Sequence, residues 1–296
     1  MLDGIDLDVP AGTVFSLLGP NGAGKTTTVN VLTTLMKADA GTVRVAGHDI
    51  ATETKAVRAL VGVTGQFAAV DELLTGQENL QLMADLKRVG SGEANRVVTE
   101  LLERFDLAES APKLVSTYSG GMRRKLDLAM TLVGNPRIIF LDEPTAGLDP
   151  RSRRTMWDTI RQLVAAGVTI FLTTQYLDEA DRLADRIAVL DQGHLVAQGT
   201  PGELKRQIPG SHVRLRFTDV HDLDAAARAL AGATRDGEED LTLRVPSDGG
   251  AKSVRALLDQ LDAQSIEAEE FSVHTPDLDD VFLALTGRTN PKEIAR

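Results

Sequence analysis

The sequence predicts an α/β fold with a largely parallel sheet, followed by a small α+β domain. Short apolar runs occur at Val14–Leu18, Ile138–Leu141, Val168–Thr174 and Ile187–Leu190. Runs that do not alternate with polar residues are typical of strands buried on both faces. Helical patterns separate these runs, and such alternation of strands and helices favours a parallel sheet covered by helices.

Length and composition set the first limits. The chain has 296 residues, enough for one large domain and a second small one. It has no cysteine, so it offers neither disulfides nor thiolate metal sites. Its formal net charge of −11 argues against nucleic acid as a partner, because phosphate binding needs concentrated basic residues. No apolar run reaches the roughly 18 residues of a membrane span, so work at a membrane would require a partner.

Apolar residues recur at helical spacing in two segments, and a glycine or proline follows each one. These segments contain Leu126, Met130 and Val133, before Gly134 and Pro136, and Trp157, Ile160 and Val164, before Gly167. We expect Trp157 to be a core residue rather than a cofactor contact. The basic cluster Arg123–Lys125 is interpreted as a solvated helix face, in preference to a lipid contact.

Two antiparallel sections are expected beside the parallel strands. Thr42–Val45, followed by Gly47, indicates one near the start of the chain. Asp191–His194 has the composition of a hairpin turn between Ile187–Leu190 and Leu195–Ala197. Thr200–Glu203 then resembles a capping box that opens a helix with proline at its first position.

A second pattern begins after Pro209-Gly210. We predict a β-α-β-α-β-α domain. Five segments carry its pattern: two alternating strands, a helical stripe, a further strand and a last helix, at residues 213–217, 241–245, 254–261, 266–273 and 275–287. Residues 236–240 are expected to be a solvated turn. The predicted boundaries are therefore 1–207 for the first domain, 208–287 for the second and 288–296 for a tail.

The strongest motif matches the phosphate-binding P-loop. It consists of Gly19, Pro20, Asn21, Gly22, Ala23, Gly24, Lys25, Thr26 and Thr27. It follows a predicted strand and precedes the helical run Val29–Leu35, which is the expected context. Glycines let backbone N–H groups converge on phosphate oxygens, and the helix presents its positive end to the anion. Lys25 is predicted to reach the β- and γ-phosphates, and Thr26 to ligate Mg²⁺.

The apolar run Ile138–Leu141 ends in two acids, Asp142 and Glu143. Taken alone, the pair would fit a solvated strand end. Beside a P-loop, we expect Asp142 to hold Mg²⁺ and Glu143 to polarise the attacking water.

Three further motifs carry a resemblance to ABC ATPases. Tyr118–Met122 resembles their signature sequence, which usually reads Leu-Ser-Gly-Gly-Gln, and Pro144–Asp149 resembles their D-loop. Gln66, after the strand-like Val61–Val63, matches their Q-loop. The resemblance covers residues 1 to about 207 and implies a P-loop core with an antiparallel β subdomain and a helical subdomain. It also implies ATP and Mg²⁺ as cofactors, with Gln66 contacting the nucleotide and serving as a ligand of Mg²⁺.

Ser119, Gly120 and Gly121 precede a second predicted helix, whose N-terminus is suited to anions. The same residues would also serve as an ordinary capped helix start. Similar proteins use them in a head-to-tail homodimer, where each signature motif closes over the γ-phosphate held by its partner. The resemblance therefore implies a composite ATP site.

Finer similarity points to ATPase subunits of daunorubicin/doxorubicin-resistance exporters. It is carried by residues 63–66, 74–80, 174–180 and 276–287. The resemblance implies ATP hydrolysis at the cytoplasmic face of the cell membrane, driving efflux of a drug- or antibiotic-like compound through a separate ABC-2-like permease. Phe67–Leu80 would face that permease, and the C-terminal domain would support assembly. Two alternatives are a soluble non-transport ABC ATPase and a module that holds ATP without turnover.

The chain departs from the general ABC pattern at three places. Gln175 stands where most members have histidine; its amide can donate to the γ-phosphate but cannot titrate near neutral pH. Met122 replaces the glutamine that ends the signature. Relatives usually have an extra strand and an adenine-stacking aromatic residue before the equivalent of Leu2, whereas the first aromatic residue here is Phe15. We expect the natural chain to begin upstream; the alternative is loose adenine binding.

Overall fold

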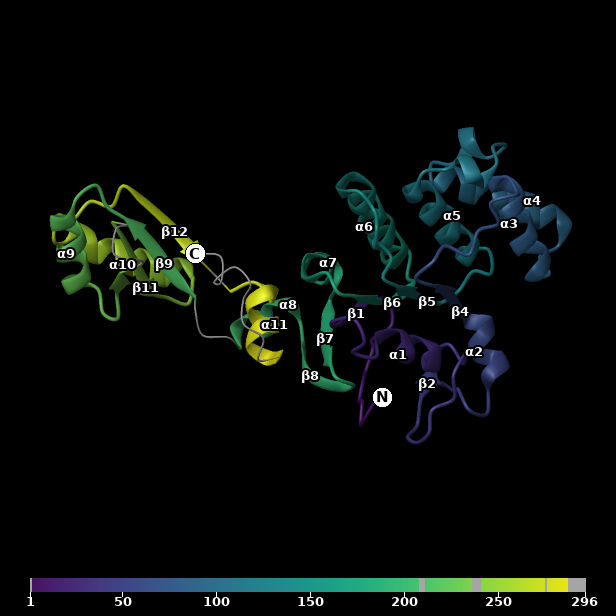
Figure 1. Ribbon diagram of the computed structural model, residues 1–296, viewed down its shortest axis with the longest axis horizontal. Helices are drawn as coiled ribbons and strands as arrows, with labels where there is room; N and C mark the ends of the chain where they lie inside the picture. The colour runs from purple at the N-terminus through teal and green to yellow at the C-terminus, as the bar shows by residue number, and fades with distance from the viewer. Residues whose placement is uncertain (1, 208–210, 236–240, 275, 287–296) are drawn as a thin grey trace. The chain divides into compact units, whose positions relative to one another are not determined.

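A computed structural model describes residues 2–207, 211–235, 241–274 and 276–286. The chain divides into two compact units, Met1–Pro201 and Gly202–Arg296, which run from purple to teal and from green to yellow in Figure 1. Several predicted features lie outside the described residues: the Pro209-Gly210 boundary, the turn at 236–240, the closing Gly287 and the tail at 288–296. No helix in the described ranges is long and apolar enough to span a membrane.

A six-stranded sheet forms the centre of the first unit. Its order is β4 (Val61–Thr64), β5 (Ile138–Asp142), β6 (Thr169–Thr174), β1 (Val14–Leu18), β7 (Arg186–Asp191) and β8 (His194–Gly199). Neighbouring strands are parallel except for the β7–β8 hairpin. The predicted α/β fold is confirmed, and the parallel strands bring the ends of β1, β5 and β6 to one edge of the sheet.

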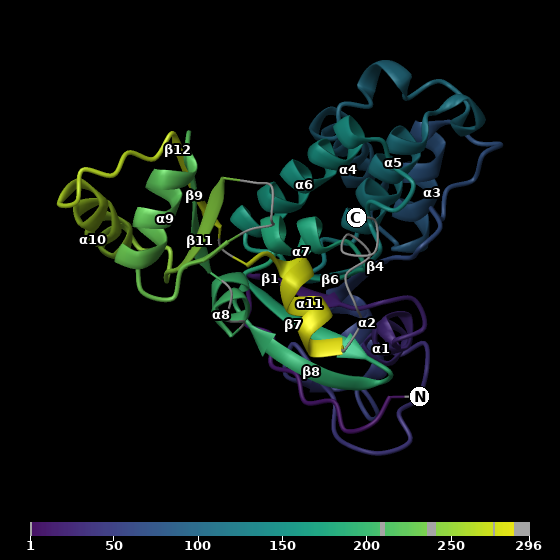
Figure 2. The ribbon, with the colours of Figure 1, turned by 60° about the vertical axis from the view of Figure 1, so that its left-hand side comes forward.

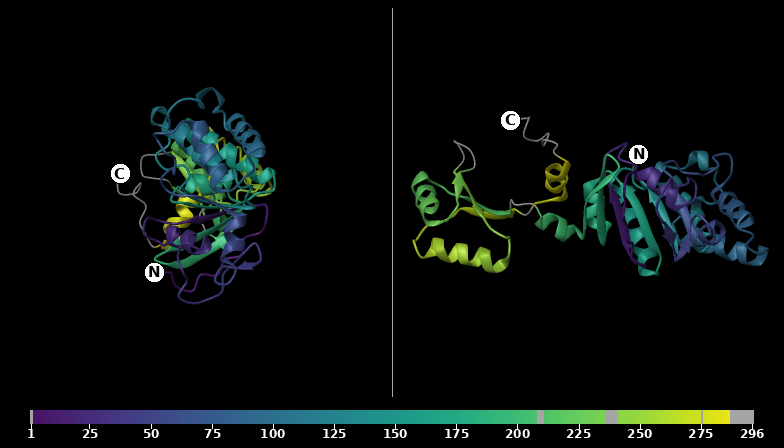
Figure 3. Two further views of the ribbon diagram at one scale, coloured as in Figure 1. Left: turned by 90° about the vertical axis from the view of Figure 1, so that its right-hand side faces the viewer. Right: turned by 90° about the horizontal axis from the view of Figure 1, so that it is seen from below.

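Successive residues of the strands point into two different cores. Phe15 of β1 packs with Phe171 of β6, their ring centroids 5.5 Å apart, in the core that also receives α1 (Lys25–Leu32) and α2 (Thr54–Leu60). Val14 points into the opposite core with α5 (Gly120–Leu132), α6 (Pro150–Ala165) and α7 (Leu177–Leu183). Figures 1 and 3 show α1 below the sheet and α5 and α6 above it. The sheet is thus covered on both faces.

The helical subdomain consists of α3 (Gly76–Leu86), α4 (Ser91–Arg104) and α5, which pack on one another (Figure 1). Two 3₁₀ turns, Ala108–Ser110 and Val115–Thr117, lead into α5. Helix α3 opens with a capping box, in which Thr75 Oγ1 accepts from the N–H of Glu78 and the Glu78 carboxylate accepts from the N–H of Thr75.

The expected antiparallel sections are both present. Strands β2 (Arg44–Val45) and β3 (His48–Asp49) pair across Ala46 and Gly47, whose φ values of 52° and 85° suit a tight hairpin turn. The β7–β8 hairpin turns at Gln192-Gly193 as predicted. Helix α1 ends three residues before the expected Leu35, because Thr34 adopts a left-handed φ of 64° that stops the helix.

The second unit has a four-stranded antiparallel sheet in the order β10-β11-β9-β12. Its elements are α8 (Pro201–Arg206), β9 (His212–Arg216), α9 (Val220–Ala229), β10 (Thr234–Arg235), β11 (Thr242–Pro246), α10 (Ala251–Asp262), β12 (Glu270–His274) and α11 (Leu278–Thr286). Figure 2 shows α9 and α10 on one face of this sheet. From β9 to β12 the topology is that of a ferredoxin-like β-α-β-β-α-β unit. The sequence pattern missed the short β10 and started β12 too early.

Candidate functional site

The glycine-rich loop joins β1 to α1, at the strand edge where β5 and β6 also end. Gly22 and Gly24 have left-handed φ values of 82° and 111°, which only glycine adopts without strain. A Cβ on Gly19 would lie 2.3 Å from the Leu190 carbonyl oxygen, so this position also requires glycine for lack of space. In the same loop Asn21 and Gly22 are exposed, whereas Ala23 is buried. The loop thus has the glycine conformations and close packing that a phosphate-binding loop requires.

Lys25, the first residue of α1, is buried beneath this loop. Its Nζ donates to the carbonyl oxygens of Gly19 at 2.8 Å and Pro20 at 3.1 Å. It also lies 3.3 Å from Glu143 Oε1, and the two side chains are only 5% and 8% exposed. The carbonyl and carboxylate oxygens around the Lys25 ammonium are hydrogen-bond acceptors, as phosphate oxygens are. Phosphate oxygens can therefore replace them as partners of Lys25.

Asp142 ends β5 and is oriented by hydroxyl groups from two other elements. Its Oδ2 accepts from Thr26 Oγ1 at 2.8 Å, and its Oδ1 accepts from Thr173 Oγ1 of β6. The P-loop threonine and the carboxylate therefore meet as two hard oxygen donors, which are the ligands that Mg²⁺ prefers. These residues fit the divalent cation that accompanies a nucleoside triphosphate.

Glu143 is held in a strained conformation. Its φ is 48°, a left-handed value that a non-glycine residue adopts at a cost of about 1–3 kcal/mol. Its N–H donates to the Thr173 carbonyl oxygen at 3.1 Å and to Thr173 Oγ1 at 3.2 Å. Its carboxylate lies between Lys25 and Gln175, whose Nε2 is 3.5 Å from Glu143 Oε2. The fold thus fixes the Glu143 backbone while its side chain faces the loop.

The Q-loop and signature residues lie apart from this cluster. Gln66 follows β4 and is exposed, as are Ser119 and Gly120. Ser119 Oγ accepts from the Met122 N–H at 3.2 Å and caps α5, so the ordinary capping role is present. Within the described part of the chain, no hydrogen bond or ion pair joins Gln66 or the signature to the P-loop.

The interpretation of Arg123–Lys125 as a solvated face is wrong for its central residue. Arg124 is 6% exposed and its side chain points toward the sheet. Three adjacent helical residues point in three directions, so a run of like charges cannot share one face. The sequence did carry one signal for a buried Arg124. Polar residues recur on one side of α5 at Arg124, Asp127 and Thr131, and the first two have opposite charges three residues apart.

Sequence reasoning also missed Glu179 on α7, which is fully buried. Its Oε1 accepts from Thr145 Oγ1 at 2.8 Å and from Trp157 Nε1 at 3.0 Å. Burial raises the pKa of Glu179 above its ordinary value of 4.5. Trp157 is a core residue, as predicted, and its indole N–H helps to attach α7 to α6.

Known proteins resemble this chain along its whole length. A family model described as ABC transporter matches residues 2–146. The daunorubicin/doxorubicin resistance ATP-binding protein DrrA of Streptomyces peucetius is 50% identical, covering 97% of this chain and 88% of its own. The doxorubicin resistance ATP-binding protein DrrA of Mycobacterium tuberculosis strain H37Rv is 41% identical, covering 99% and 89%.

Solved structures agree with this similarity. An ATP-binding subunit of an ABC transporter has a TM-score of 0.62 at 29% identity, covering 70% of this chain and 86% of its own. A dimeric post-hydrolysis state of an ATP-binding cassette, bound to ADP and phosphate, has a TM-score of 0.61 at 26% identity, covering 67% and 90%.

Proposed function

The chain belongs to the ABC transporter family as an ATP-hydrolysing subunit, and we propose that it powers efflux of a drug- or antibiotic-like compound through a separate membrane permease. The observation that carries this proposal is the contact of Lys25 with Glu143 beside Asp142, which gathers the groups for phosphate binding and hydrolysis. The drug-resistance subunits that match 97–99% of the chain support transport over the non-transport alternative.

ATP binding is assigned first to the P-loop. The backbone N–H groups of residues 19–27 would hold the β- and γ-phosphates, with Lys25 supplying the positive charge. Thr26 and Asp142 would hold Mg²⁺, which supplies charge neutralisation on the transferring phosphate. Gln66 is proposed as a further contact to the ion. Its side chain follows β4 and is exposed.

Hydrolysis is assigned to Glu143. Its carboxylate would accept a hydrogen bond from the attacking water and take its proton as the water oxygen bonds to the γ-phosphorus, while the bond from that phosphorus to the bridging oxygen breaks and ADP leaves. Gln175 would donate its amide N–H to the γ-phosphate, a role that its position 3.5 Å from Glu143 supports. An amide cannot carry the proton, so Glu143 is the proposed acceptor in this site.

Two chains would form the complete site. The exposed N-terminus of α5, with Ser119, Gly120 and Gly121, would close over the γ-phosphate of a partner chain in a head-to-tail homodimer. The similarity to a dimeric cassette supports this arrangement.

The permease is proposed to be ABC-2-like and to bind residues 67–80 at the cytoplasmic face of the membrane. Phe67 and Leu73 are 85% and 84% exposed, and apolar side chains this exposed are typical of an interaction surface. The C-terminal unit is proposed to support dimer or permease assembly. Deleting the residues after Pro209 and measuring dimer formation by light scattering tests that role.

The assignment of Glu143 is tested by Glu143→Gln. The variant should bind ATP, accumulate as an ATP-bound dimer and lose steady-state hydrolysis, because the amide cannot accept a proton. Glu100→Gln, on the exposed surface of α4, is the matched control and should hydrolyse ATP normally. Full ATPase activity in Glu143→Gln would refute the assignment of the base.

Efflux is tested in cells. Co-expression with a candidate ABC-2-like permease should lower the accumulation of a drug such as daunorubicin, and Glu143→Gln should abolish the effect. A non-transport ATPase would leave drug accumulation unchanged and would not associate with the membrane. Co-purification with a multi-helix membrane protein is expected only for the transporter subunit.

A further inference from the structure

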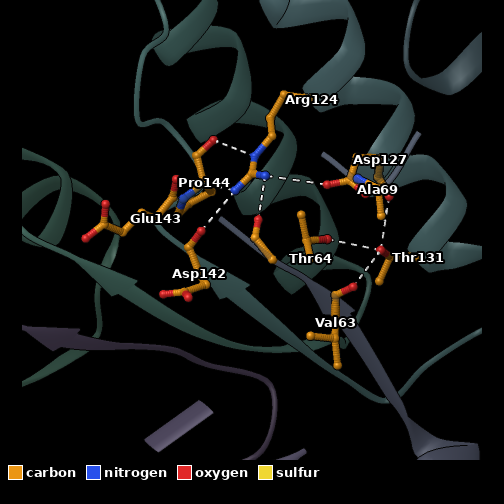
Figure 4. Close-up of polar contacts among 10 residues, drawn as sticks. Val63, Thr64, Ala69, Arg124, Asp127, Thr131, Asp142, Glu143 and Pro144 are labelled. Carbon is orange, nitrogen blue, oxygen red and sulfur yellow. Dashed lines mark hydrogen bonds and ion pairs between the residues drawn. The ribbon is translucent and has the colours of Figure 1, made fainter. Parts of the chain in front are cut away.

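One arginine joins the proposed catalytic glutamate to the Q-loop. Arg124 of α5 directs all three guanidinium nitrogens at backbone carbonyl oxygens (Figure 4). Its Nε donates to Pro144 at 3.0 Å, its Nη1 to Gly65 at 2.7 Å, and its Nη2 to Asp142 at 3.0 Å and Glu143 at 3.3 Å. The acceptors lie just past β4 and at the end of β5, so one side chain fastens two neighbouring strand ends to α5.

A buried guanidinium needs this many partners. Removing a charge from water costs several kcal/mol, and the cost is recovered only when hydrogen bonds satisfy the group. Burial lowers the pKa of Arg124, while the carboxylates of Asp127, Asp142 and Glu179 oppose that change. An arginine remains charged at neutral pH even so. The contacts therefore act as charge-assisted hydrogen bonds, which are stronger than those between neutral groups.

The Arg124 contacts fall on the strained residue. Glu143 has a φ of 48°, and its N–H is held by Thr173 of β6. Arg124 binds the carbonyl oxygen of the same residue and those of both its neighbours. A strained backbone conformation persists only where the surrounding structure fixes it, here by hydrogen bonds to both the N–H and the carbonyl oxygen of Glu143. Arg124 supplies the hydrogen bond to the carbonyl oxygen, so the direction of the Glu143 side chain depends on Arg124.

Two further side chains on the same side of α5 bind the strand-end segment that includes the Q-loop. Asp127 lies 3.5 Å from Arg124 Nη1, and its Oδ1 accepts from the Ala69 N–H at 3.2 Å. Thr131 Oγ1 lies 3.0 Å from Thr64 Oγ1 (Figure 4). Gln66 lies between Thr64 and Ala69, so its segment is fixed to the same helix that fixes Glu143.

We propose that Arg124 is a positioning residue for ATP hydrolysis, which fixes the Glu143 backbone and, with Asp127, ties it to the Q-loop. The inference rests on the proposed role of Glu143 as the base. Lysine cannot replace arginine here, because its single ammonium cannot reach acceptors on two strands at once. Loss of the hydrogen bonds made by the Arg124 guanidinium should leave ATP binding intact and slow the chemical step.

The first experiment compares Arg124→Gln and Arg124→Lys in the full chain. For both variants we expect kcat to fall about 10- to 100-fold, since small misplacement of a catalytic group has effects of this size. The KM for ATP and the Kd for a fluorescent ATP analogue should stay within about threefold of wild type. Such a split between kcat and KM is not expected from general destabilisation.

The matched control is Arg123→Gln on the preceding residue. Arg123 also donates to backbone carbonyls, at Val115 and Ser116, but these lie in the loop before α5. Its loss should change kcat less than about twofold. An equal fall in kcat for both arginines would overturn the inference.

The second experiment places Arg124→Gln in the Glu143→Gln background and measures residual hydrolysis in single turnovers. If Arg124 acts through Glu143, the double variant should be no slower than Glu143→Gln alone, because the two effects are not additive. Multiplied losses would overturn the inference.

The two proposals can fail separately. Full activity of Glu143→Gln refutes the base, whereas wild-type kcat in Arg124→Lys beside an inactive Glu143→Gln refutes the positioning role alone. Nucleotide binding and thermal unfolding report whether each variant folds. If Arg124→Gln does not fold, Arg124→Lys decides.

Discussion

Thr173→Val should weaken the proposed Mg²⁺ site without disturbing the sheet around it. Thr173 lies in the buried middle of the site, where its hydroxyl donates to Asp142 Oδ1 and accepts from the Glu143 N–H at 3.2 Å. Valine has nearly the same shape, so little cavity forms, but Asp142 loses one of the two hydroxyl groups that orient it.

The size of the effect follows from these contacts. A hydrogen bond to a charged group contributes about 1.5–3 kcal/mol, and about 1.4 kcal/mol corresponds to a tenfold change in an equilibrium constant. If roughly half of that free energy serves to orient Asp142, the Mg²⁺ concentration for half-maximal ATPase activity should rise about 3- to 10-fold. The free energy of unfolding should fall by about 1–3 kcal/mol.

Thr169→Val on the same strand is the matched control. Its Oγ1 is also buried and accepts from the Gly12 N–H at 2.9 Å, far along β6 from Asp142. It should lower the unfolding temperature to a similar degree and leave the Mg²⁺ dependence unchanged. The same Mg²⁺ dependence in Thr173→Val, Thr169→Val and wild type would refute the proposed orientation of Asp142.

Three further predictions concern other parts of the site. Gln175→Ala should lower ATP turnover about tenfold in the assembled transporter by removing a γ-phosphate donor; unchanged turnover would exclude that role. Burial raises the pKa of Glu179, so this carboxyl group lowers the free energy of unfolding as pH rises past its ordinary pKa of 4.5. Glu179→Gln should abolish that pH-dependent loss when urea unfolding is measured as pH rises above 4.5, and an unaltered slope would contradict the assignment. Gly19→Ala should unfold at a much lower temperature than Gly22→Ala, since its Cβ would lie 2.3 Å from Leu190 O, whereas Gly22 has open space and only an unfavourable φ of 82°. Equal unfolding temperatures would show that the loop can shift to accept the methyl group.

The nucleotide-binding part of the fold was predictable because its signals are local. The apolar run Val14–Leu18 and the glycines that follow it specify a strand, a tight loop and a helix start within one short segment. The same holds for the β7–β8 turn at Gln192-Gly193. Element ends were less predictable: α1 stops at Leu32 because Thr34 turns to a left-handed φ, which hydrophobic spacing does not encode.

Partners of buried polar groups were not predictable. The spacing of Arg124, Asp127 and Thr131 places these residues on one side of α5 but does not say what that side contacts. Only packing of α5 against the sheet turns Arg124 inward toward the carbonyl oxygens of Asp142 and Glu143. Their acceptor atoms are backbone atoms, so no side-chain motif marks them.

The sequence by itself determined that the chain has a P-loop, two acids after a buried strand and the ordered motifs of an ABC ATPase. Each of these depends on residue type and short spacing, because glycine conformations, strand burial and helix starts are decided locally. Tertiary structure alone decided that Lys25 meets Glu143, that Thr26 and Thr173 orient Asp142, and that Arg124 holds the Glu143 backbone. Those contacts join residues that are distant in the chain, and they form only because parallel strands end at one edge of the sheet.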